Sequence, residues 1–242
     1  MRILFGSALL LSLALGGTAA AQSTSLTRSE VTAIRAKLVA VQQAMGADPA
    51  GYVKESEDFN LPTDFNAAQG GKFWPITSSI RLRYTDKAST EGRANAEKAM
   101  QDFQTKYASA AATGNVEALT KLTEELQKVQ AAAMTPPVKQ QPMDVNVQLN
   151  MNPTVGIDPA AVVLERAGVI ALRDKNVSSA NGSVTVYVDP VALRNSSDLA
   201  KIELRTADDG VSNKTGVYHV VIQLNGAGPD LEAWAKAFDY VA

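Results

Sequence analysis

The sequence predicts an α+β fold, with a mostly antiparallel sheet of about five or six strands, a helix near each end, and an inserted antiparallel helical hairpin. Two observations lead to this prediction. Residues 91–113 and 115–134 place apolar side chains at helical spacing and are joined by one or two residues, as in a helical hairpin. Residues 144–152 alternate strictly between apolar and polar side chains, as a half-buried strand does, and further β-rich runs follow.

The first 21 residues have the pattern of a secretory signal peptide. Arg2 precedes an apolar run from Ile3 to Leu15, and small residues lead up to the bond between Ala21 and Gln22. The run is shorter than the roughly 20 residues that a membrane-spanning helix needs. We therefore expect cleavage after Ala21, export, and no transmembrane segment in the mature chain.

Composition excludes several kinds of chemistry. The 242 residues include no cysteine and one histidine, so there is no disulfide framework, thiolate nucleophile or cysteine zinc site. The 23 lysines and arginines nearly balance 25 aspartates and glutamates, which does not favour a nucleic-acid binder. A cysteine-free exported chain indicates the periplasm of a Gram-negative bacterium or secretion, and we expect no metal and no cofactor.

The N-terminal third is expected to contain one helix, an irregular segment and one strand. Thr27 and Glu30 have capping-box spacing, and the helix that they begin should stop at Gly46. Residues 47–77 lose all periodicity and contain three prolines, which predicts a long irregular segment, yet their aromatic residues indicate that it packs on the body. Residues 80–84 alternate between apolar side chains and arginines, which predicts a strand with one buried and one basic face.

The hairpin prediction extends to its packing. We expect an apolar seam in which one set of side chains faces another, namely Leu119, Leu122, Leu126 and Val129 against Met100, Phe103 and Tyr107. Pro136 and Pro137 should end the second helix.

The last hundred residues are expected to be mainly strands. After the strand at 144–152, we predict a short helix at 159–165, strands at 168–173, 183–188, 200–205 and 216–224, and an amphipathic terminal helix from Pro229. Because strand 80–84 precedes the hairpin and the other strands follow it, we favour one domain, 22–242, with the hairpin 91–135 inserted. The alternative is a helical domain, 22–135, followed by a β-rich domain, 143–242.

Few residues carry a recognisable chemical pattern. His219 lies in a β-rich run and is expected to be an ordinary strand residue, and Asp209-Gly210 is typical of a turn rather than of a metal site. The amides of Asn146, Gln148, Asn150 and Asn152 suit sugar hydroxyls, but we favour the interpretation that they form the solvated side of a half-buried strand.

The candidate ligand-binding residues are Tyr52, Phe73, Trp74, Arg81 and Arg83, because aromatic rings and cations on a long loop favour recognition. The alternative is that these rings only cover the core, with Phe73 and Trp74 as buried anchors. We expect an exported non-enzymatic envelope protein that acts in protein interaction or ligand binding, with another envelope protein or a small polar ligand as partner. The alternative function is a carboxylate- or serine-lysine-dependent hydrolase of cell-wall or glycan material.

Overall fold

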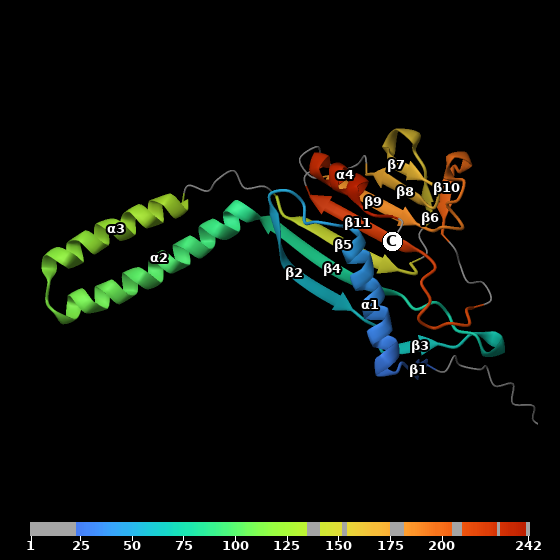
Figure 1. Cartoon of the computed structure of the whole chain (residues 1–242), viewed down its shortest axis with the longest axis horizontal. Helices are drawn as coiled ribbons and strands as arrows, with labels where there is room; N and C mark the ends of the chain where they lie inside the picture. The colour runs from blue at the N-terminus through green and yellow to red at the C-terminus, as the bar shows by residue number, and fades with distance from the viewer. Residues whose placement is uncertain are drawn as a thin grey trace, which may run out of the picture.

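The computed structural model describes residues 23–134, 141–151, 154–174, 182–204, 210–226 and 228–240. These residues form an α+β fold with four α-helices and an open, fully antiparallel sheet of seven strands in the order β2-β4-β5-β11-β9-β8-β7 (Figure 1). Two strands come from before the helical hairpin and five from after it, so the sheet joins both parts of the chain. No helix in the described ranges is both long enough and apolar enough to cross a membrane.

The elements have the following bounds. The main sheet contains β2 (Tyr52–Asn60), β4 (Ser78–Asp86), β5 (Met143–Leu149), β7 (Val162–Arg166), β8 (Val169–Arg173), β9 (Gly182–Val188) and β11 (Val220–Gly226). Two short ladders pair β1 (Ser23–Ser25) with β3 (Asp64–Asn66), and β6 (Thr154–Gly156) with β10 (Lys201–Glu203). The helices are α1 (Arg28–Ala44), α2 (Lys87–Ala112), α3 (Val116–Met134) and α4 (Gly228–Ala237).

One face of the sheet is covered by helices and forms the main core. α1 lies against β4 and β5, and α4 lies against β9 and β11. Leu38 of α1 and Leu231 of α4 are both fully buried in this core. The Trp234 ring meets Tyr84 and Phe238 edge-on, with centroids 5.3 and 5.4 Å away. The predicted capping box at Thr27 is present and fixes the start of α1.

The opposite face is covered over only part of its width. A second apolar cluster, which includes Ile170, Tyr187 and Val221, joins β8, β9 and β11 to the segment around the β6–β10 ladder. Along β2, β4, β5 and the last residues of β11 this face carries polar side chains instead. We call this polar part the open face.

The helical hairpin is an insertion between two neighbouring strands. β4 runs directly into α2, and α3 leads back to β5, which pairs with β4 in antiparallel register. Asp86 accepts hydrogen bonds from the backbone and side chain of Ser89, so α2 begins at Lys87, four residues earlier than predicted. The hairpin projects away from the sheet, and neither helix lies on the core (Figure 1).

The prediction of a long irregular segment at 47–77 was wrong, because residues 52–60 form β2. This edge strand pairs with β4 through a bulge at Glu55, which breaks the alternation that identifies a strand. Its middle residues are exposed and polar on both sides, so no apolar period marks it. With β2 and β7, the main sheet has seven strands rather than five or six.

The prediction of a short helix at 159–165 was also wrong. Asp158 and Pro159 begin only a single 3-10 turn, which ends at Ala161. The β-branched Val162 and Val163 then enter β7, which pairs with β8.

Three predicted strands have different ends. The strand at 200–205 is reduced to the three residues of β10 and pairs with β6 outside the main sheet, and β11 begins at Val220 rather than at 216. β5 ends at Leu149, because Asn150 adopts a left-handed φ of 57°. The side chain of Val129, Pro136 and Pro137, Asn152, and Asp208 and Asp209 lie outside the described residues.

Candidate binding site on the open face of the sheet

Two rows of side chains cross the open face at right angles to its strands. In one row the register aligns Ser56, Arg83, Asp144 and Asn225, and in the other it aligns Asp58, Arg81, Asn146 and Gln223. Cross-strand partners point to the same face of a sheet, and strands lie about 4.8 Å apart. The rows therefore place polar side chains from four strands beside one another.

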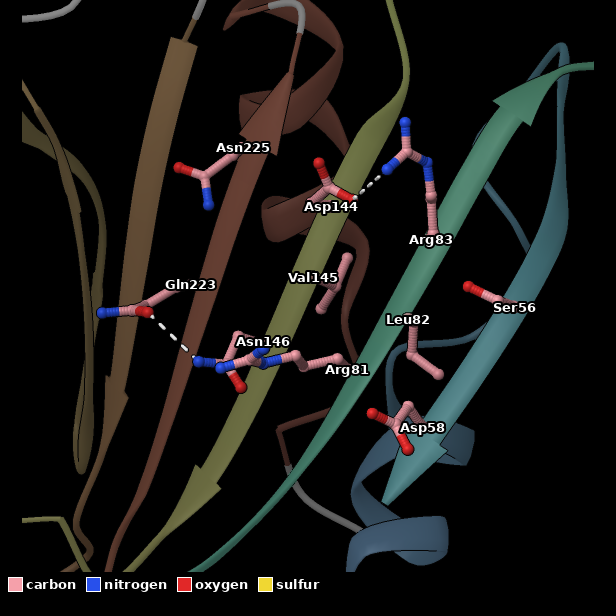
Figure 2. A pocket seen from close by; sticks show the side chains of 10 residues that line it. All are labelled: Ser56, Asp58, Arg81, Leu82, Arg83, Asp144, Val145, Asn146, Gln223 and Asn225. Atoms are coloured by element: carbon pink, nitrogen blue, oxygen red, sulfur yellow. Dashed lines mark hydrogen bonds and ion pairs between the residues drawn. The ribbon is translucent and has the colours of Figure 1, made fainter. Parts of the chain in front are cut away.

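These side chains line a hollow of about 470 Å³, which we call the polar hollow (Figure 2). Leu82 and Val145 complete its lining. The buried helix-covered face lies behind it, so a rigid core supports its floor. The Asn146 amide donates to the Gln223 side-chain oxygen at 3.4 Å, which links β5 to β11 across the floor.

Arg83 is held by carboxylates at the end of the hollow nearest the hairpin. Its guanidinium lies 3.4 Å from Glu55 and 4.0 Å from Asp144. The other oxygen of Glu55 lies 3.9 Å from Arg93 of α2, so the bulge residue of β2 bridges the sheet and the base of the hairpin. All four side chains are at least 40% exposed, and each pair contributes little to stability.

Arg81 is different, because no carboxylate in the described part of the chain lies within ion-pair distance of its guanidinium. Its side chain runs from β4 toward Asn146 and Gln223, and away from Asp58 (Figure 2). The hollow thus contains a free guanidinium next to two amides.

The five candidate residues from the sequence do not form one cluster. Arg81 and Arg83 line the polar hollow, as the alternation of β4 predicts. Tyr52 is buried in the main core, where its hydroxyl donates to the Gln141 carbonyl at 3.1 Å; burial, with the nearby Asp230 and Asp86, raises its pKa.

The two aromatic candidates lie in the connection between β3 and β4. The half-buried Phe73 packs edge-on against Phe65 at 5.1 Å, and the Lys214 ammonium lies over both rings. Trp74 is 45% exposed and is therefore not a buried anchor.

The predicted amide row divides into two roles. Asn146 and Gln148 are half-buried on the open face, whereas Asn150 is buried and ties strand ends together. His219, just before β11, is 2% exposed and belongs to the interior.

Sequence reasoning missed five lining residues, namely Ser56, Asp58, Asp144, Gln223 and Asn225. Gln223 and Asn225 alternate with Ile222 and Leu224 in β11, which is a signal for one polar face. Strand order decides which polar residues meet, and the sequence does not show that β11 lies beside β5.

No group of three or more acidic or histidine side chains within the described ranges could hold a metal ion. No known protein family, curated protein or solved structure matches this chain, so the chemistry of the hollow is argued from its own residues.

Proposed function

We propose that this chain is an exported, non-enzymatic binding protein that holds a small anionic, hydroxyl-bearing ligand in the polar hollow. The observation that carries the proposal is the free guanidinium of Arg81 among the amides of Asn146 and Gln223.

The chemistry of these groups suits a carboxylate and hydroxyls. A guanidinium presents a planar fork of donors that matches a carboxylate with two parallel hydrogen bonds. Side-chain amides both donate and accept, as a sugar hydroxyl requires. An acidic sugar carries both groups, so a uronic acid is the simplest probe.

The position of the groups supports a binding role. They lie on four paired strands over a packed core, which holds them in place before a ligand arrives. The hollow has the volume of a small-molecule site.

Isothermal titration with sodium glucuronate tests the proposal. We expect saturable binding at one site, and Arg81→Gln should weaken it by about tenfold or more because a charged hydrogen bond contributes about 1.5–3 kcal/mol. Arg81→Lys should weaken it too, since an ammonium lacks the fork. The matched control is Arg194→Gln, an exposed arginine outside the hollow, which should bind as the parent does. Equal affinity of the parent and Arg81→Gln, or no binding by either, would overturn the assignment.

Export is a separate part of the proposal, supported by the leader pattern at residues 1–21. Intact-mass analysis of the periplasmic fraction should give a chain that begins at Gln22. A mass that includes residues 1–21 would contradict it.

The hydrolase alternative rests on the two carboxylates in the hollow, Asp58 on β2 and Asp144 on β5. They lie in different rows with β4 between them, so strand spacing puts their Cα atoms roughly 12 Å apart. A glycoside hydrolase needs its two carboxyl groups about 5–9.5 Å apart across the scissile bond, which is less than the separation of these two Cα atoms. Release of reducing ends from oligogalacturonate by the parent, lost in both Asp58→Asn and Asp144→Asn, would favour this alternative.

A further inference from the structure

The hairpin of α2 and α3 has an apolar surface that its own fold leaves uncovered. Of the hairpin side chains that the structure describes, only Ala110 and Leu122 are buried. Met100 and Tyr107 are 37% and 46% exposed, although the sequence predicts both to face α3. The half-buried Phe103 lies between them in sequence, and its ring centroid is 5.7 Å from that of Tyr107.

This amount of burial is small for a projecting element. Helices in water are stabilised mainly by packing of their apolar face, and short isolated ones are marginal. The sheet does not supply that packing, because the hairpin projects beyond it (Figure 1). Met100, Phe103 and Tyr107 therefore present apolar surface that is free to pack against another protein surface.

We propose that this surface is the hairpin of a second copy, and that two hairpins pack face to face as a four-helix bundle in a homodimer. Charge favours a second copy over a strongly charged partner. Residues 87–134 contain six lysines and arginines and six aspartates and glutamates, with the two signs interspersed. Because this surface has no net charge, two copies of it do not repel each other. It also has no strong electrostatic field that would favour a basic or an acidic partner.

The available area is also enough. The shorter helix, α3, has 19 residues and is about 28 Å long, and each helix is about 10 Å wide. Two hairpins in contact along that length would cover roughly 1,100 Å² in total, slightly above the roughly 1,000 Å² that a specific interface needs. A two-fold axis would bring the same side chains together from both copies, so Tyr107 and Met100 would meet their own counterparts or each other. This inference does not depend on the ligand of the polar hollow.

Light scattering and sedimentation equilibrium on protein purified after expression of the full chain test the proposal. We expect twice the mass of a single chain. Tyr107→Lys, at a position exposed in the single copy, should raise the dimer dissociation constant at least about tenfold, as loss of an aromatic anchor does. Its helix content by circular dichroism should not change. Val191→Lys is the matched control, because Val191 is 62% exposed but lies outside the hairpin, and it should leave the dimer intact.

A second measurement covers the case in which Tyr107→Lys loses helix content. The chain has no cysteine, so Thr105→Cys, at an exposed position of α2 on the side away from Met100, Phe103 and Tyr107, carries a single spin label and leaves those three side chains in place. In a dimer the two labels, one on each copy, give a measurable dipolar coupling. A monomer carries one label and gives none. A monomer at about 100 μM, a dimer unaffected by a folded Tyr107→Lys, or no dipolar signal would overturn the proposal.

Discussion

Replacement of Asn150 by alanine should destabilise the protein far more than its position in a polar strand pattern suggests. The Asn150 amide donates to the carbonyls of Ile76 and Gly216, both at 2.9 Å, and its oxygen accepts from the backbone of Tyr218 at 2.9 Å. Its own backbone N–H donates to the His219 carbonyl at 3.1 Å. One side chain therefore joins the end of β5 to the segments that enter β4 and β11.

The magnitude follows from these contacts. Each of the three side-chain hydrogen bonds contributes about 1 kcal/mol, and Asn150 is only 5% exposed, so truncation leaves the buried Ile76 carbonyl without this partner, whereas Gly216 and Tyr218 are half-buried. Its φ of 57° adds a penalty of about 1 kcal/mol for alanine, because asparagine tolerates this region better. We expect Asn150→Ala to lose about 3–5 kcal/mol of unfolding free energy. Asn150→Gly lacks the same three hydrogen bonds but has no φ penalty, so it should lose less unfolding free energy than the alanine variant.

Urea unfolding followed by tryptophan fluorescence measures the effect, since Trp234 lies in the main core. With a slope of about 2–3 kcal/mol/M, the expected loss moves the midpoint down by about 1–2.5 M. Asn146→Ala is the matched control from the same strand, because Asn146 is half-buried on the open face and should lose no more than about 1 kcal/mol. A loss below about 1 kcal/mol for Asn150→Ala would refute the proposed role of its hydrogen bonds.

Three further predictions concern acid stability, the aromatic loop and the hairpin. The hydrogen bond from the Thr27 backbone, helped by a nearby lysine, lowers the pKa of Glu30 to about 2. Its stabilisation is therefore present above the unfolded pKa of about 4.5 and is lost as pH falls toward 2, so the stability gap between parent and Glu30→Gln in urea should close over that range. Phe73→Ala should lower the unfolding free energy by about 2–4 kcal/mol and Trp74→Ala by less than about 2, since Trp74 is 45% exposed; equal losses in calorimetry would contradict this order. Leu122→Asp places a charge at a buried position of the hairpin and should cost several kcal/mol, and a melting temperature within a degree or two of the parent would show that the seam is not buried.

The elements with regular periodicity were predictable. The alternation in residues 80–84 identified β4 and assigned Arg81 and Arg83 to one face, and helical spacing identified α2 and α3. These patterns arise from local geometry and burial on a single side, so they are visible without knowledge of neighbours.

The remainder depends on contacts between distant segments. β2 is polar on both sides because it is an edge strand. Glu57 pairs with Lys54 of the same strand and accepts a hydrogen bond from Gln42 of α1 at 3.3 Å. A carboxylate in that position breaks the apolar alternation. The composition of the polar hollow likewise required the strand order, since Asp58 and Gln223 are 165 positions apart in sequence but belong to the same cross-strand row.

The hairpin and the polar hollow share the same two strands, which connects the two proposals physically. The register of β4 and β5 continues to the pair of Tyr84 and Met143, both buried, so the core fixes the strands up to the base of the hairpin. The ladder therefore does not need a short loop to hold its register, and a long insertion between β4 and β5 leaves Arg81 and Asn146 in place. The hairpin can extend as a separate contact surface while the hollow stays rigid, with Glu55 as a weak, exposed bridge between them. Loss of the dimer contact is accordingly expected to leave the ligand affinity of the hollow unchanged.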